Sequence, residues 1–157
     1  MLALRIKSFV ELGNQMKEAL GREDGEFQGL NKQQINLLLQ VRKSGLTNGW
    51  FTKKMVSKAL DGIMEMLNEK HLEKWLDVYV EEIKKNRQNR EVGLIMAGNI
   101  PAVGFHDFLC VLISGHTAVV KTSSDDECLI PSIADLLISI DSSFSNKINI
   151  LSRPRSN

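Results

Sequence analysis

The chain has 157 residues, of which 43% are hydrophobic and 25% charged, and its formal net charge at pH 7 is +1. This composition is typical of a globular protein with one medium domain, or with a helical lobe joined to half of a larger domain. The near-neutral charge gives no reason to expect nucleic acid or an anionic membrane as a partner. The longest apolar stretch, residues 100–120, is interrupted by polar residues, proline and glycine, so no membrane span is expected. Charges appear too early for a signal peptide, and a cytoplasmic location is the default expectation.

Residues 1–90 show the three- and four-residue spacing of apolar side chains that is typical of amphipathic helices. After a first helix at the start of the chain, a second is expected over residues 31–43, with Gly45 as its stop. Thr52 is a suitable N-cap for a third helix, and Asn68 separates that helix from a fourth. The residues expected to face inward include Leu4, Phe9, Leu12 and Met16 in the first helix, Leu38, Leu39 and Val41 in the second, and Val56, Leu60 and Ile63 in the third.

Beyond residue 90 the pattern changes to short apolar runs rich in β-branched residues, separated by apolar helical segments. The expected strands are Val92–Met96, Thr117–Lys121 and Ile148–Leu151, and the expected helices cover residues 102–114 and 129–140. A β-α-β-α-β order with short connections predicts a parallel sheet buried under helices. The expected fold class is therefore α/β, with a helical lobe over residues 1–90 and a parallel-sheet portion over residues 91–157.

Polar residues follow the first two expected strands. Gly98 and Asn99 come after the first strand, and Lys121 ends the second, with Ser123 and Ser124 behind it. Ligands of open α/β sheets bind beyond the carboxyl ends of the strands. There an uncharged amide can stabilise a developing oxyanion, and a lysine with hydroxyl groups can hold ribose or phosphate oxygens. The structural alternative is a plain strand-end turn in which Asn99 caps a helix and Lys121 is only solvated.

The same segment resembles a known superfamily. The order of a strand, Asn-x-Pro at residues 99–101, an apolar helix and Gly-x-x-x-Val-x-Lys-x-Ser at residues 115–123 resembles the aldehyde dehydrogenases. In detail, residues 96–116 (MAGNIPAVGFHDFLCVLISGH) resemble the LuxC-type acyl-CoA reductases, and residues 48–76 resemble the helical lead-in of that family. The resemblance spans about residues 9–151 and implies the first part of an aldehyde-dehydrogenase-like Rossmann domain.

Carried over residue by residue, the resemblance implies a site. Asn99 matches the family asparagine that donates a hydrogen bond to the carbonyl oxygen of the substrate. Lys121 matches the lysine that binds the adenosine ribose of the cofactor. Ser124 stands where many NAD-using relatives have glutamate, whose charge would repel a 2′-phosphate, so NADPH is expected and NADH is the alternative. The cofactor-binding residues implied by the resemblance are Gly98, Asn99, Ile100, Pro101, Lys121, Ser123 and Ser124, with Pro101 in the first turn of the following helix.

The implied activity is oxidoreductase chemistry, the reduction of an acyl-CoA or acyl-protein thioester to an aldehyde, without a metal. The family's catalytic cysteine belongs to a later domain, and neither Cys110 nor Cys128 matches it. We therefore expect a cofactor-binding front part that is inactive by itself; assembly into a homo-oligomer stays open. The alternative from another class is a non-catalytic interaction module. An unrelated nucleotide-binding domain is disfavoured because no glycine-rich phosphate motif is present.

A few conspicuous side chains are interpreted as structural. Trp50, Phe51 and Trp75 are expected to pack between the helical lobe and the sheet. His106 and Asp107 are neighbours at the start of a helix and therefore point in different directions. They are expected to cap or pack locally, with a place in the lining of the site as the alternative.

Overall fold

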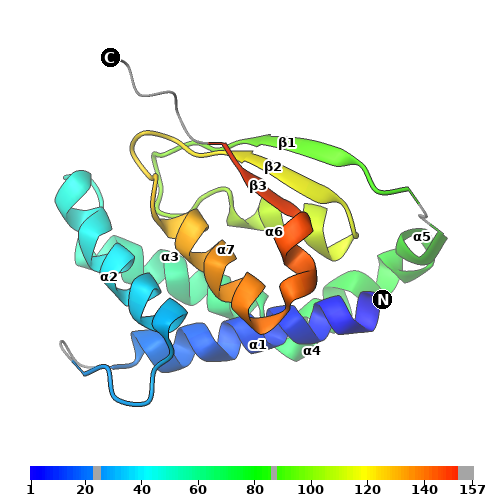
Figure 1. Cartoon of the computed structure of the whole chain (residues 1–157), viewed down its shortest axis with the longest axis horizontal. Coiled ribbons are helices and arrows are strands. Elements are labelled where there is room, and N and C mark those ends of the chain that lie inside the picture. Colours follow the sequence, from blue (N-terminus) through cyan, green and yellow to red (C-terminus); the bar gives the residue numbers. More distant parts are fainter. Residues whose placement is uncertain (23–25, 86–87, 152–157) are drawn as a thin grey trace.

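The computed structural model describes residues 1–22, 26–85 and 88–151. It is a layered α/β structure, in which a parallel sheet forms one outer layer and helices cover one of its faces (Figure 1). Two helices from the C-terminal part lie directly against the sheet, and the helices of the N-terminal part lie on their far side (Figure 1).

The N-terminal part is helical, as the spacing predicts. Thr52 Oγ1 accepts a hydrogen bond from the Met55 amide, and Asn68 Oδ1 accepts one from the Lys70 amide, so both residues are the caps expected from the sequence. The elements are α1 (Leu2–Leu20), α2 (Lys32–Thr47), α3 (Lys53–Met66), α4 (Glu69–Leu76), the 3₁₀ turn η1 (Asp77–Tyr79) and α5 (Val80–Lys85).

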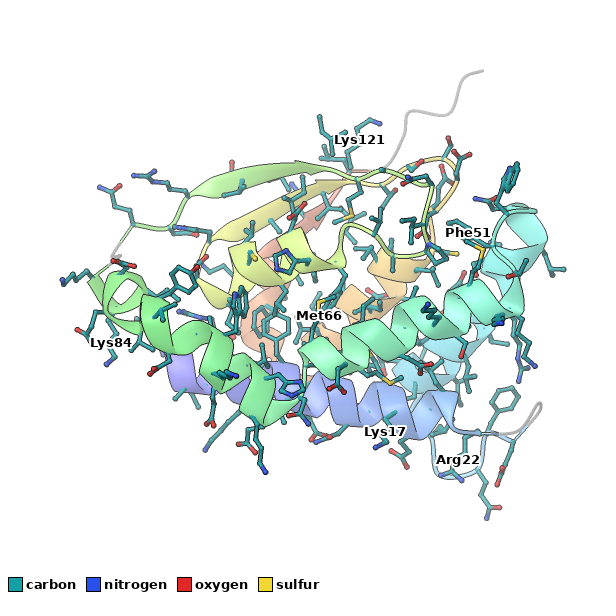
Figure 2. The ribbon with its side chains drawn as sticks, turned by 180° about the vertical axis from the view of Figure 1, so that it is seen from behind. Lys17, Arg22, Phe51, Met66, Lys84 and Lys121 are labelled. Atoms are coloured by element: carbon teal, nitrogen blue, oxygen red, sulfur yellow. The ribbon has the colours of Figure 1, made fainter. Side chains whose placement is uncertain are left out.

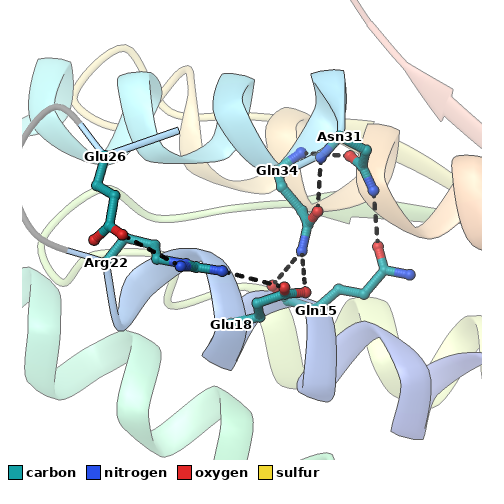
Figure 3. Close-up of polar contacts among 6 residues, drawn as sticks. All are labelled: Gln15, Glu18, Arg22, Glu26, Asn31 and Gln34. Atoms are coloured by element: carbon teal, nitrogen blue, oxygen red, sulfur yellow. Dashed lines mark hydrogen bonds and ion pairs between the residues drawn. The ribbon is translucent and has the colours of Figure 1, made fainter. Parts of the chain in front are cut away.

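A polar contact joins α1 to the start of α2 (Figure 3). Asn31 and Gln34 form a reciprocal capping box, each side chain accepting from the backbone amide of the other at 2.9 Å. The Gln34 side chain is 3% exposed, and its amide nitrogen donates to Glu18 Oε2 at 3.0 Å and to the Gln15 carbonyl at 3.2 Å. Because a buried amide without partners is costly, this network defines how α2 is placed on α1.

The C-terminal part has the expected β-α-β-α-β order. All strands are parallel in the order β1-β2-β3, and β1 pairs with β2 so that Ile95 lies opposite Lys121. The connecting helices lie on the same face of the sheet, so the other face is uncovered (Figure 1). The elements are β1 (Glu91–Ile95), α6 (Phe105–Ile113), β2 (Thr117–Lys121), α7 (Leu129–Ile140), the 3₁₀ turn η2 (Ser142–Asn146) and β3 (Ile148–Ile150).

One hydrophobic core runs through both parts of the chain. Phe9 of α1 is fully buried, and its ring meets that of Phe144 in η2 edge-to-face, with the centroids 5.6 Å apart. The core contains residues from α1 to α4 as well as residues from α6, β2 and α7. The helical lobe therefore supplies the apolar surface that covers α6 and α7 on the side away from the sheet.

Several expected burial positions are wrong. Leu4 is 64% exposed and Leu39 is 47% exposed, because α1 packs through the side that carries Phe9 and Leu12, and α2 packs through Leu37. Trp50 is 82% exposed, while the next residue, Phe51, is 1% exposed. The two follow each other in a connecting segment, where one can be buried and its neighbour solvated.

Two expected boundaries are also wrong. Gly45 does not end the second helix, which continues to Thr47. A Cβ at Gly45 would lie 3.0 Å from the Phe51 carbonyl oxygen, so the glycine permits a close approach of the next segment. The helix expected from residue 102 begins at Phe105, because Ala102 has a φ of +52°, which is incompatible with a right-handed helix.

Candidate functional site at the carboxyl edge of the sheet

Two loops meet where β1 and β2 end. The Met96 amide, directly after β1, donates a hydrogen bond to the Lys121 carbonyl at 3.0 Å. Further along, the backbone of Gly98 lies against the loop after β2. A Cβ at Gly98 would be 2.7 Å from Ser123 Cβ and 2.8 Å from Asp125 Cβ. The predicted site residues 98–101 and 121–124 therefore lie together at one edge of the sheet, as parallel pairing requires.

Asn99 and Lys121 are both exposed at this edge. Within the described part of the chain, neither the Asn99 amide nor the Lys121 ammonium forms a hydrogen bond or ion pair. In β2, Ala118 and Val120 are fully buried, so Lys121 projects on the side without helices (Figure 2). Its partner in β1, Ile95, is 86% exposed. The edge thus offers an uncharged donor and a cation to a ligand.

The other predicted residues differ in accessibility. Ile100 is 49% exposed, Ser124 is exposed, and Ser123 is half-buried with its hydroxyl accepting from the Asp125 amide at 3.2 Å. Pro101 is buried and lies in a turn before α6, so its expected place in the first turn of that helix is wrong. The left-handed Ala102 next to it redirects the chain before the helix can begin.

Asp126 joins the loop after β1 to the loop after β2, and this role was not predicted from the sequence. Its side chain is 6% exposed, and its Oδ2 accepts the Ala102 amide at 2.7 Å while its Oδ1 accepts the Leu129 amide at 3.4 Å. Burial raises the pKa of Asp126, and the two backbone donors oppose this shift. Asp126 does not occupy the N-cap position of α7, which is Cys128, and its bond to Ala102 spans 24 residues, so no local pattern indicates either contact.

The helical lobe contacts the same loops. The Asn48 side-chain amide, at the end of α2, donates to the Asp125 carbonyl at 3.2 Å. Cys128 Sγ donates to the Gln40 carbonyl at 3.7 Å. These two contacts join α2 to the loop after β2 and fix the position of that loop relative to the helical lobe.

Cys110 Sγ lies 3.8 Å from the ring nitrogens of His106, one turn earlier in α6, but the raised pKa of the thiol disfavours a thiolate. Burial raises the pKa of Cys110, and the negative charge of Asp107 raises it further. Burial also raises the pKa of Cys128, and the negative charge of Asp126 raises it further. The His106 ring lies against Trp75 of α4, with the centroids 5.8 Å apart and the rings tilted by 48°, at a hollow of about 360 Å³ between α3, α4 and α6. This contact agrees with the packing role expected for His106 and for Trp75.

Replacing Gly98 tests the contact between the two loops. Gly98→Ala is expected to lower the free energy of unfolding by about 1–3 kcal/mol, because the new methyl group collides with Ser123 and Asp125. Gly93→Ala in β1 is the matched control, since a Cβ there meets nothing within 4 Å. Urea denaturation followed by circular dichroism measures both; equal stability of the two variants would show that the loops separate at no cost.

The comparisons with known proteins leave the family open: no protein-family model matches the chain, and no curated protein matches it. Over the described ranges, every helix is too short or too polar to cross a lipid bilayer. The same ranges contain no group of three potential metal-binding side chains close enough to share an ion.

Proposed function

We propose that this chain is the cofactor-binding front part of an acyl thioester reductase, with NADPH held at the carboxyl edge of the sheet. The proposal extends the resemblance of residues 96–116 to the LuxC-type reductases and of residues 115–123 to the aldehyde dehydrogenases. The observation that carries it is the joint exposure of Asn99, in the loop after β1, and of Lys121, at the end of the adjacent parallel strand β2. In the described part of the chain neither side chain forms a hydrogen bond or ion pair. Open α/β sheets bind nucleotide cofactors at this edge.

The polar groups around Lys121 suit the adenosine end of the cofactor. Its ammonium is a cation with three donors, which can bind ribose hydroxyls or a 2′-phosphate. The exposed Ser124 adds a hydroxyl and no negative charge, so it does not repel a 2′-phosphate. These features favour NADPH over NADH, whereas the exposed carboxylate of the neighbouring Asp125 acts against this preference.

Asn99 suits the reacting end of the substrate. When bound, NADPH supplies the hydride that reduces the acyl group to the aldehyde. As negative charge develops on the carbonyl oxygen, an amide N–H can donate to it without changing protonation state. Neither Cys110 nor Cys128 is suited to attack the thioester, because the pKa of each thiol is raised. The proposal therefore assigns this chain oxyanion stabilisation and cofactor binding, and expects no turnover from it alone.

Cofactor titration tests the proposal. Isothermal titration of the purified chain is expected to show saturable NADPH binding, and Lys121→Ala is expected to weaken it about tenfold by removing charged hydrogen bonds. Lys17→Ala, which removes an exposed lysine from α1, is the control and should leave the affinity unchanged. NADH should bind more weakly than NADPH. A folded chain that binds neither cofactor, or that loses binding equally in both variants, would favour a non-catalytic interaction module.

A further inference from the structure

A second polar cluster lies at the opposite edge of the sheet, at the turn between α6 and β2. The turn passes through Gly115, which has a φ of +95°, and His116, which precedes the first residue of β2. Lys121 is the last residue of β2, five residues beyond His116, so the two lie roughly 16 Å apart at about 3.3 Å per residue. The cluster is therefore independent of the proposed cofactor site.

Two cations from distant parts of the chain meet at this turn. Arg5 of α1 donates through Nε to the Ile113 carbonyl at 2.8 Å, and a Cβ at Gly115 would lie 2.9 Å from Arg5 Nη1. Lys147, just before β3, donates through Nζ to the Gly115 carbonyl at 3.3 Å. Glycine is required here both for the left-handed backbone and for the close approach of the guanidinium.

A third cation and the imidazole complete the cluster. The Arg90 backbone amide donates to His116 Nδ1 at 3.3 Å, which leaves Nε2 as the nitrogen that carries the proton in the neutral ring. Burial lowers the pKa of His116, and the charges of Arg90, Lys147 and Arg5 lower it further. All three positive charges are thus close enough to act on one ring.

In the part of the chain that the structure describes, no carboxylate lies within ion-pair distance of these cations. Arg5, Arg90 and Lys147 form no ion pair there, and burial alone accounts for the lowered pKa of Arg5. Asp141 is engaged elsewhere: Ser8 donates to its Oδ2 at 2.8 Å, and the Ser143 amide donates to its Oδ1 at 3.0 Å.

Helix capping explains only part of this arrangement. The carbonyl groups at the end of α6 carry roughly half a negative charge, which a single cation would balance. Three cations exceed that requirement, and placing them together without counter-charge is unfavourable unless an anion joins them. The half-buried turn keeps Arg5, His116 and Lys147 accessible to a small solute.

We propose that the turn at Gly115 and His116 is an anion site that binds a phosphate or diphosphate group between Arg5, Arg90 and Lys147. A doubly or more highly charged oxyanion matches the excess positive charge, and its oxygens can accept from guanidinium and ammonium groups at once. This site goes beyond the proposed reductase function and does not depend on it.

Nuclear magnetic resonance of the three histidines tests the site with inorganic pyrophosphate as the probe, at constant ionic strength. The ring signals of His116 are expected to shift saturably, and its pKa should rise as the anion offsets the surrounding cations. His71 and His106 lie on other surfaces and serve as internal controls. Inorganic phosphate should act more weakly because it carries less charge. Equal shifts of all three histidines, or a His116 shift that does not saturate, would overturn the proposal.

Variants distinguish specific binding of pyrophosphate at this turn from its general attraction to the positively charged surface. Lys147→Gln and Arg90→Gln are each expected to weaken pyrophosphate binding about fivefold. Lys7→Gln removes an exposed charge from the same helix as Arg5 and should leave binding unchanged. Lys121→Ala should also leave it unchanged, which keeps the outcome distinct from that of the NADPH titration. Equal weakening by Lys7→Gln would contradict the site.

Discussion

Phe9→Ala is expected to lower the free energy of unfolding by about 3–5 kcal/mol, because it empties a fully buried position in a packed core. The loss also removes the edge-to-face contact with Phe144. Since Phe9 belongs to α1 and Phe144 to η2, the residue links the helical part to the parallel-sheet part. We therefore expect the sheet to lose stability together with the helices, in one cooperative transition.

Hydrogen exchange measures this coupling. In Phe9→Ala, the amides of β2 and those of α1 should lose protection by the same free energy. Leu4→Ala on the same helix is the control: Leu4 is 64% exposed, so its replacement should change stability by less than about 0.5 kcal/mol. If β2 kept its protection while α1 lost it, residues 1–90 and 91–157 would be separate folding units.

Asp126→Ala is expected to destabilise the chain by about 2–4 kcal/mol, because it leaves the Ala102 and Leu129 amides without their acceptor. Asp126→Asn should cost less, since one carbonyl oxygen remains to accept from Ala102. Loss of the Ala102 bond releases the turn that carries Asn99 and Pro101 against the loop after β2. The predicted NADPH affinity should therefore fall in Asp126→Ala even though Asp126 does not face the ligand.

The pH dependence of stability gives an independent test of the Asp126 environment. Burial raises the pKa of Asp126 in the folded chain, so the Asp126 carboxylate binds its proton more tightly in the folded chain than in the unfolded chain. The stabilisation from Asp126 is then complete below the ordinary aspartate pKa of about 3.9 and is lost as the pH rises through the higher folded value. Urea denaturation should show wild type losing stability relative to Asp126→Asn as the pH rises; a constant difference would contradict the raised pKa.

Local patterns predicted most of the secondary structure. The strand Thr117–Lys121 and the helix Leu129–Ile140 have the bounds expected from their sequences, and Thr52 and Asn68 are the expected caps. These features depend on neighbours within about four residues, through β-branched side chains, apolar spacing and capping groups. The placement of Asn99 and Lys121 at one edge was also predictable, because parallel pairing places the ends of successive strands together.

Features that depend on distant residues were not predictable. The left-handed Ala102 delays α6 because Asp126 binds its amide from 24 residues away. The exposure of Trp50 could not be predicted either, since no local pattern distinguishes Trp50 from the buried Phe51. No sequence spacing indicates that Arg5 reaches the turn at Gly115, because Arg5 and its hydrogen-bond partner Ile113 are 108 residues apart in the sequence.

The amino-acid sequence by itself determined the α/β class, the β-α-β-α-β succession of elements along the chain and the edge at which polar residues gather, because those properties follow from periodicity and local stereochemistry. Only the tertiary structure decided which face of the sheet Lys121 occupies, that Asp126 joins the two loops, and that three cations share the turn at Gly115. The physical reason is that burial and electrostatic neighbours are set by the packing of α1 and α2 on α6 and α7, and no short segment of sequence encodes that packing.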